Sequence, residues 1–173
     1  MKITLRYPAS PENAADHARI AMELARNEYD AVLDLSPASL EVRVDMNALV
    51  VRDGTGGIKP LSDRDRREIA VTARKVLAAD RNPEAVFAAD KFAPGADGGG
   101  EISGTFTLRG APGPLTLKVS ETGPDRYHAD GTIVQSSYGI KPYTGFFGAL
   151  RVRDAVDVAV DVDLSGMEDG HRI

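Results

Sequence analysis

Residues 136–164 read SSYGIKPYTGFFGALRVRDAVDVAVDVDL, a loop rich in glycine and aromatic residues that runs directly into a regular strand pattern. From residue 156 to residue 164, valine or leucine fills every second position, and aspartate or alanine fills the positions between. This period-2 alternation is typical of a strand with one face in a core and the other in water. Four valines on one face also favour a strand over a helix, because β-branched side chains lose rotamer freedom in a helix.

The loop before this strand gathers Tyr143, Phe146 and Phe147 around Gly145 and Gly148. One interpretation is a bend, which glycine permits, that lays these bulky apolar groups over an opening in the fold. The other is a plug, in which the same side chains fill that opening. The sequence of the loop is consistent with both interpretations.

The same alternation recurs along most of the chain and predicts strands in eight further places. These are residues 2–7, 18–25, 29–35, 40–46, 85–92, 102–108, 115–119 and 127–133.

The segment from residue 12 to residue 26 gives two conflicting signals. Its alanine, glutamate and methionine content favours a helix, whereas the spacing of its apolar residues favours a strand. We prefer a strand over 18–25, followed by a tight turn and a hairpin partner at 29–35. We also expect residues 49–51 to extend the 40–46 strand past a kink.

One helix is expected after the glycine-rich loop at residues 53–57. Ser62 or Asp63 can cap its start, and an apolar stripe at helical spacing continues to about Ala78. The stripe consists of Ile69, Ala73, Val76 and Leu77.

The order of these elements predicts an all-β fold with one α-helix. Strands do not alternate with helices, so a parallel sheet is not supported. A closed antiparallel β-barrel of about eight strands, lipocalin-like in form, would leave no exposed strand edge. We expect residues 1–165 to form this single domain and residues 166–173 a polar C-terminal tail.

The tetrapeptide Gly-Ile-Lys-Pro occurs twice, at residues 57–60 and 139–142. Four residues do not establish an internal repeat. We interpret the two copies as reuse of one turn, placed at related positions on the barrel rim.

Composition excludes several classes of function. A net charge of −5 weighs against a nucleic-acid or acidic-lipid surface, which requires clustered lysine and arginine. The absence of cysteine excludes disulfides, a thiolate nucleophile and thiolate metal ligands. The first residues show no apolar segment after their basic residue, and no run of roughly eighteen apolar residues occurs, so we expect a cytoplasmic protein.

Five segments carry a resemblance to a known family: VDMNALVVRDG (44–54), SDRDRREI (62–69), NPEAVFAADKF (82–92), GTFTLRG with LTLKV (104–119) and SYGIKPYTGFFGALRVRD (137–154). With these segments in this order, the chain resembles the YceI-like family, in a shorter cytoplasmic branch. The resemblance implies a lipocalin-like antiparallel barrel with the helix near one end. It also implies binding of a polyisoprenoid or similar long amphiphile in an elongated apolar lumen, and a strand in the ambiguous segment.

Candidate catalytic and metal sites are weak. His17 is a candidate because imidazole is the side chain most often used as a base or a metal ligand. No second histidine and no pair of carboxylates stands at metal-ligand spacing from it. We therefore interpret His17 as a hydrogen-bonded residue of a turn. Asp157, Asp161 and Asp163 share one outward strand face and are expected to be solvated. Ser136 lacks the surroundings of a nucleophile elbow. We therefore predict no catalytic residue, no metal and no cofactor.

The remaining candidate is a distributed ligand site at the barrel mouth. The inward faces of the strands, with aromatic and aliphatic side chains, are predicted to form its walls. Aromatic side chains are the expected lining or lid, and polar side chains are expected to meet a ligand head group. The aromatic set is Phe87, Phe92, Phe106, Tyr143, Phe146 and Phe147, and the polar set is Lys59, Lys141, Tyr138 and His17.

From these residues we predict a non-catalytic module that binds a long apolar or amphiphilic small molecule. The first alternative is a barrel whose lumen is packed by its own side chains, acting through surface contacts or as a homodimer. The second is an enzyme resting on His17 and the tyrosines of the mouth.

Overall fold

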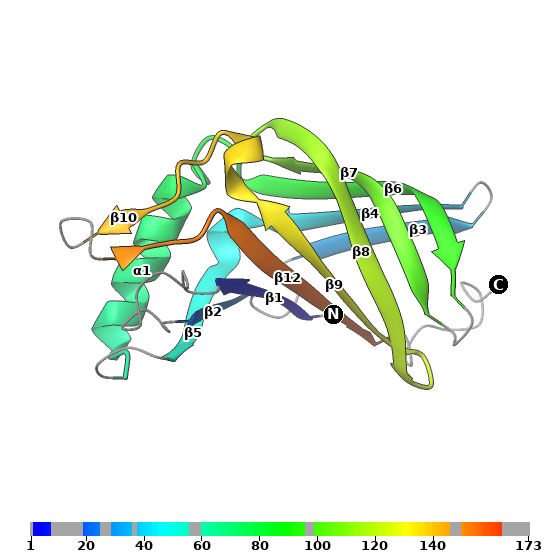
Figure 1. The fold of residues 1–173 in the computed structure, drawn as a ribbon, viewed down its shortest axis with the longest axis horizontal. Coiled ribbons are helices and arrows are strands. Elements are labelled where there is room, and N and C mark those ends of the chain that lie inside the picture. The colour runs from blue at the N-terminus through cyan, green and yellow to red at the C-terminus, as the bar shows by residue number, and fades with distance from the viewer. Residues whose placement is uncertain are drawn as a thin grey trace.

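An antiparallel sheet of ten strands forms most of the molecule (Figure 1). The computed structural model describes the backbone of residues 2–7, 19–24, 29–35, 38–55, 60–95, 99–145 and 150–163, and the side chains of residues 40–54, 60–95, 99–144 and 152–163. The strands of the main sheet are β1 (Lys2–Tyr7), β2 (Arg19–Leu24), β3 (Tyr29–Leu35), β4 (Ala38–Asp45), β5 (Leu49–Thr55), β6 (Glu84–Pro94), β7 (Gly100–Leu108), β8 (Ala111–Gly123), β9 (Arg126–Val134) and β12 (Ala155–Asp163).

Smaller elements join these strands. They are the 3-10 helix η1 (Met46–Ala48), the helix α1 (Asp63–Val76), the 3-10 helix η2 (Gln135–Tyr138) and a two-stranded ladder of β10 (Thr144–Gly145) and β11 (Leu150–Arg151). The predicted strands and the helix are all present, with ends shifted by a few residues.

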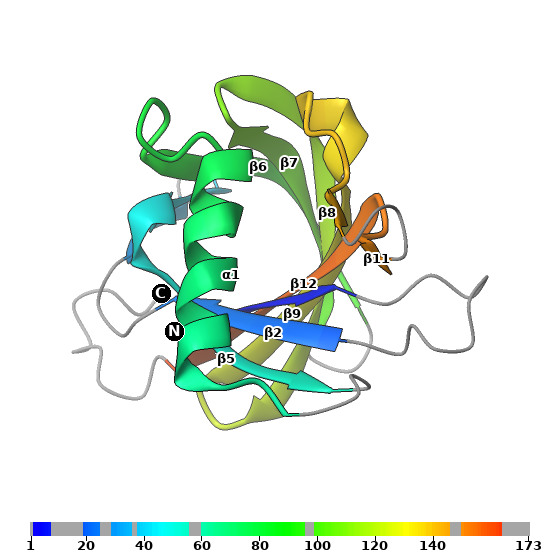
Figure 2. The ribbon, with the colours of Figure 1, turned by 90° about the vertical axis from the view of Figure 1, so that its left-hand side faces the viewer.

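The main sheet is strongly curled, with the order β3-β4-β6-β7-β8-β9-β12-β1-β2-β5 (Figures 1 and 2). The predicted mostly antiparallel fold with one helix is therefore confirmed. The predicted number of about eight strands is corrected to ten. The described pairs do not establish closure of the barrel, because none of them joins β3 to β5. The shape that the described pairs establish is a curled half-barrel.

The prediction that residues 49–51 extend the preceding strand is wrong. After β4 the chain turns through η1 and enters β5, which pairs with β2 at the opposite end of the sheet order. The Asp45 side chain accepts a hydrogen bond from the backbone N–H of Asn47 at 2.8 Å, and Met46 N–H donates to the Pro83 carbonyl at 2.7 Å. These bonds hold the chain in the turn, which regular alternation does not reveal.

The predicted hairpin between residues 18–25 and 29–35 is also wrong. β2 lies between β1 and β5, whereas β3 pairs with β4 over Leu35↔Ala38 to Tyr29↔Val44. Two residues of the sequence separate β3 from β4, whereas four residues separate β2 from β3. Alternation specifies which face of a strand is buried, but it does not specify the neighbouring strand.

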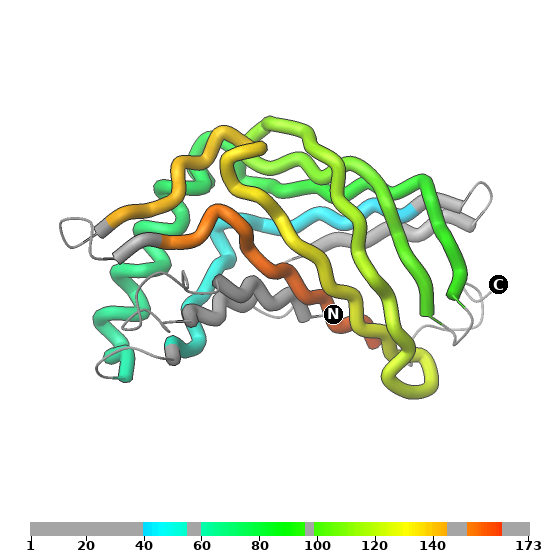
Figure 3. Tube along the Cα trace, viewed as in Figure 1, coloured from blue at the N-terminus to red at the C-terminus, as the bar shows by residue number. Residues whose placement is uncertain are grey.

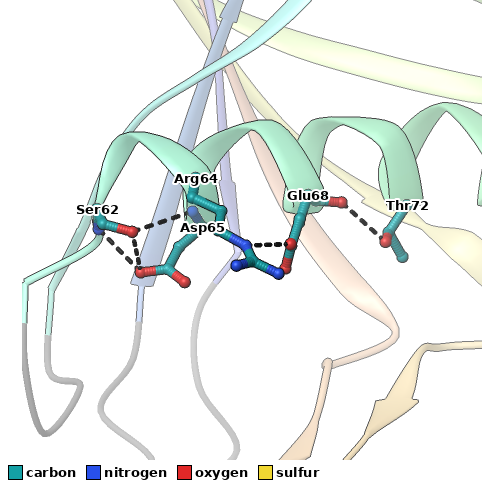
Figure 4. Close-up of polar contacts among 5 residues, drawn as sticks. All are labelled: Ser62, Arg64, Asp65, Glu68 and Thr72. Carbon is teal, nitrogen blue, oxygen red and sulfur yellow. Dashed lines mark hydrogen bonds and ion pairs between the residues drawn. The ribbon is translucent and has the colours of Figure 1, made fainter.

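The helix α1 begins with a capping box, as Figure 4 shows. Ser62 Oγ accepts a hydrogen bond from Asp65 N–H at 3.2 Å, and Asp65 Oδ2 accepts from Ser62 N–H at 2.9 Å. Two orphan N–H groups of the first turn are satisfied in this way. Farther along, Arg64 Nε donates to Glu68 Oε1 at 2.8 Å, and Thr72 Oγ1 donates to the Glu68 carbonyl at 2.9 Å.

The predicted apolar stripe of α1 faces the core. Leu77 is buried, and Ile69, Ala73 and Val76 are partly buried against the same cluster. The helix contacts β5 and lies across one end of the curled sheet (Figure 2). We refer to this end as the α1 end and to the opposite end of the strands as the far end.

The core lies on the concave face of the sheet, which the Cα trace of Figure 3 outlines. Alternate residues of β6, β8, β9 and β12 are buried or partly buried, and the residues between them are mostly exposed. The chain path therefore places one row of apolar side chains per strand inside the curl.

Candidate ligand-binding site

The apolar rows on the concave face change in exposure along the strands. At the α1 end the inward side chains are buried, for example Phe87 at 5%, Leu108 at 6% and Val156 at 4% exposure. At the far end, inward side chains that pack against the same core keep accessible surface. They are Leu40, Ile102, Val119 and Val160. Phe92 lies on the same face but outside this cluster, and it is 36% exposed.

Register places most of these residues in two rows that also contain buried residues. Phe92 pairs with Ile102, which pairs with Leu117. One row farther on, Val119 pairs with Ala129, which pairs with Val160. Directly opposite residues on antiparallel strands point to the same face, so the far end presents apolar rows in which Leu117 and Ala129 are buried and the residues beside them are partly exposed.

Three of the predicted site residues meet at the α1 end of this lining. Phe87 pairs with Phe106, and the ring of Phe106 meets that of Tyr138 edge-on, with centroids 5.6 Å apart and an interplanar angle of 74°. Burial raises the pKa of the Tyr138 phenol above its ordinary value, so this group remains a protonated hydroxyl at neutral pH. It is 4% exposed.

Tyr138 belongs to η2, which is anchored on two sides. Gln135 Nε2 donates to the Arg153 carbonyl at 2.7 Å, and Ser136 N–H donates to Asp154 Oδ1 at 2.7 Å. On the other side, Arg109 donates from its guanidinium to the Gly139 carbonyl at 2.7 Å. Gly139 itself has φ +68°, the left-handed conformation that glycine adopts without strain.

The other predicted site residues do not join this group. Phe92 lies at the far end, on the last part of β6. Lys141 and Tyr143 follow η2 and are exposed, Tyr143 at 42%. Lys59, Phe146, Phe147 and His17 lie outside the described residues, as does the first copy of Gly-Ile-Lys-Pro up to residue 59.

Inward aliphatic side chains were expected as part of the walls, but no individual residue was predicted. The structure shows that Ile102, Val119 and Val160 are inward and partly exposed, as is the aromatic Tyr127, which pairs with Val162. Their signal was the same alternation that marks the core. An aliphatic side chain that lines an opening has the same sequence signature as one that fills a core.

The outward aspartates of β12 are exposed, as predicted, and each has a partner on β9. Asp161 Oδ1 lies 2.6 Å from His128 Nδ1, and Asp163 Oδ2 lies 3.2 Å from Arg126 Nε. Thr132 Oγ1 donates to Asp157 Oδ1 at 3.1 Å. The described residues contain no group of three or more side chains able to hold a metal ion.

An open groove of about 520 Å³ lies elsewhere, on the outer side of β6, β7 and β8. Its lining includes Lys91, Ser103, Thr105 and Thr116, which alternate with the inward residues of their strands. Ser103 Oγ and Thr116 Oγ1 are hydrogen-bonded at 2.8 Å. The groove is also lined by glycine, proline and Leu115, a member of the buried core cluster.

Comparison with known proteins supports the resemblance drawn from the sequence. The family model described as the YceI-like domain matches residues 12–164. The chain belongs to the YceI-like family. No curated protein sequence matches this YceI-like chain.

Two solved structures share the fold of this YceI-like chain. BcnA of Burkholderia cenocepacia superposes with a TM-score of 0.61 at 14% identity, covering 92% of this chain and 94% of BcnA. The YCEI protein of Campylobacter jejuni superposes with a TM-score of 0.61 at 15% identity, covering 82% of this chain and 81% of that protein. Both support a barrel-like fold. Within the described residues, no helix has the length and apolar character needed to span a bilayer.

Proposed function

We propose that this YceI-like protein binds a long apolar or amphiphilic small molecule, isoprenoid- or lipid-like, on the concave face of its sheet, without catalysis. The observation that carries the proposal is the apolar inward face at the far end, where Ile102, Val119 and Val160 remain partly exposed beside buried neighbours. The family is known for binding hydrophobic ligands such as polyisoprenoids, which supports it. Removing such surface from water contributes roughly 25 cal/mol for each Å², so affinity requires no dedicated polar residue.

We further propose that the ten strands enclose this lining as a barrel. Only the three residues of η1 separate β4, the second strand in the sheet order, from β5, the last. The four Cα–Cα steps from Asp45 to Leu49 span at most about 14 Å. The two ends of the sheet order must therefore lie close together at this corner, which favours a closed lumen over an open trough.

Binding can be tested on the freshly purified protein by native mass spectrometry and by titration with a fluorescent isoprenoid probe. We expect a bound apolar species or saturable uptake of the probe. Val119→Thr places a hydroxyl in the lining at nearly constant volume and should weaken uptake by roughly 2- to 30-fold, given about 0.5–2 kcal/mol for an unpaired hydroxyl. Ser120→Thr, on the outer face of the same strand, is the matched control and should leave uptake unchanged.

The alternatives give different results in the same experiments. A protein with a packed lumen would show neither bound species nor uptake, and a protein that acts as a homodimer would show a stable dimer by light scattering. An enzyme resting on His17 would lose turnover of a lipid-like substrate in His17→Ala while retaining its melting temperature. The cytoplasmic location and the domain limit at residue 165 stay predictions from the sequence.

A further inference from the structure

One carboxylate interrupts the apolar rows of the concave face. In β4, β6, β7, β8, β9 and β12, the inward positions whose side chains the structure describes hold aliphatic, aromatic, glycine or proline residues, with a single exception. The exception is Glu121 of β8. It follows Val119 at an interval of two residues and pairs with Tyr127, so it takes the same face as both. A negative charge therefore stands on the inward side of the sheet.

Glu121 lies at the far end, where the concave face keeps accessible surface. Val119, which is partly exposed, is the inward residue before it, about 7 Å away along β8. Across the sheet, Glu121 pairs with Tyr127, which pairs with Val162. Tyr127 and Val162 are partly exposed, and Glu121 is exposed. This is the last inward row of β9, which begins at Arg126, so the carboxylate stands at the rim of the apolar face.

The basic residues described near this rim do not neutralise Glu121. None of the ion pairs between described residues includes it. Arg126 takes an outer position, where its Nε lies 3.2 Å from Asp163 Oδ2. Lys118 of β8 also takes an outer position. Lys141, which the sequence analysis assigned to an acidic head group, follows η2 at the α1 end. The charge that the described inward face presents at the far end is therefore negative.

We propose that Glu121 is a specificity-determining residue that selects amphiphiles with an ammonium head group over those with a carboxylate or phosphate head group. This inference rests on the proposed function. When the apolar chain lies on the concave face, a head group at the far end comes close to Glu121 and Tyr127. The carboxylate attracts an ammonium and repels an anion, and the aromatic ring can also face an ammonium. Because Glu121 is exposed, solvent limits the effect to a few fold in affinity.

Isothermal titration with farnesylamine, farnesol and farnesyl phosphate tests this inference, because the three share one chain and differ in head-group charge. Relative to the wild type, Glu121→Gln should bind farnesylamine about 2- to 5-fold more weakly and farnesyl phosphate about 2- to 5-fold more tightly, with farnesol between the two. Added salt should shrink both changes. Glu101→Gln is the matched control, since it removes the same charge from the outer face of β7 at the same end. It should leave all three affinities unchanged.

Glu121→Lys reverses the charge and should favour farnesyl phosphate over farnesylamine more strongly than Glu121→Gln does. Both variants are expected to keep the wild-type melting temperature, because the side chain is exposed. If the wild type binds farnesol but the three affinities shift in both Glu121 variants no differently than in Glu101→Gln, the inference is overturned and the proposed function stands. Tighter binding of farnesylamine by Glu121→Lys would also overturn it. If the wild type binds none of the three molecules, the inference and the proposed function are both overturned.

Discussion

At Gly104 the backbones of β6 and β7 approach so closely that one added methyl group would overlap the neighbouring strand. A Cβ atom there would lie 2.1 Å from the Ala88 carbonyl oxygen and 2.5 Å from the Ala89 Cα. The register between β6 and β7 shifts immediately afterwards, between Ala89 and Lys91. Such irregularities bend a strand and increase its twist. One residue without a side chain therefore permits the close approach at this bend.

We expect Gly104→Ala to destabilise the protein by roughly 1–3 kcal/mol, because the clash is with backbone atoms that no rotamer change can relieve. Gly123→Ala is the matched control, since a Cβ there would meet nothing within 4 Å. It should change the free energy of unfolding by no more than about 0.5 kcal/mol. Urea denaturation of both variants measures the difference, and equal midpoints would contradict this account of the bend.

Among the elements, α1 depends most on local chemistry. Its capping box joins Ser62 and Asp65, and Arg66 donates to Asp63 Oδ1 at 2.6 Å within the first turn. The hydrogen bond and charge of Arg66 lower the pKa of Asp63. Acidic side chains at this position also suit the positive end of the helix dipole. The start of α1 is therefore specified by residues that are adjacent in sequence.

We expect Ser62→Ala to cost about 1 kcal/mol of unfolding free energy at neutral pH. Because the pKa of Asp63 is lowered in the folded protein, its stabilising effect is complete above the unfolded value of about 4 and is lost as the pH falls through the lowered value. Asp63→Asn should therefore flatten the fall in melting temperature between neutral and acidic pH. Added salt should shrink the difference, because the pair is exposed. An unchanged pH profile in Asp63→Asn would contradict this assignment.

Other elements depend on partners that are distant in sequence. The alternation of apolar residues predicted each strand of the main sheet apart from β5, which was expected to continue β4. The prediction works because a strand with one buried face has an apolar residue at every second position. Strand pairing was predicted less well. β2 and β3 follow one another in the chain, yet they lie at opposite parts of the sheet order.

At the scale of the whole molecule, the curl of the sheet turns separate apolar rows into one lining. Phe92 and Ile102 come from β6 and β7 and pair directly, and Val119 and Val160, from β8 and β12, lie on either side of Ala129. Among the described aromatic residues selected from the sequence, Phe92 lies at the far end, Phe87 and Phe106 pair at the α1 end, and Tyr143 lies in the exposed segment after η2. Residue type alone did not separate these three environments.

A ligand that binds this lining should stabilise the whole fold, because the lining does not exist in the unfolded chain. We expect farnesol at about one hundred times its dissociation constant to raise the unfolding free energy by about 2.7 kcal/mol. Differential scanning calorimetry with and without farnesol measures the effect. The Val119→Thr variant at the same farnesol concentration should show a smaller increase. A farnesol-independent melting temperature in a protein that binds farnesol would mean that the unfolded chain binds it equally well.

The sequence by itself determined the strands that bury one face, the position of α1 and its cap, and the YceI-like family, because each of these depends on neighbouring residues or on a linear motif. Only the tertiary structure decided which strands pair, that β4 passes into β5 at the other end of the sheet, and that Tyr138 meets Phe106 edge-on. Those features depend on register and curvature, which join residues far apart in the chain. The candidate site follows from them, since its lining is the ordinary apolar face of several strands brought together by the curl.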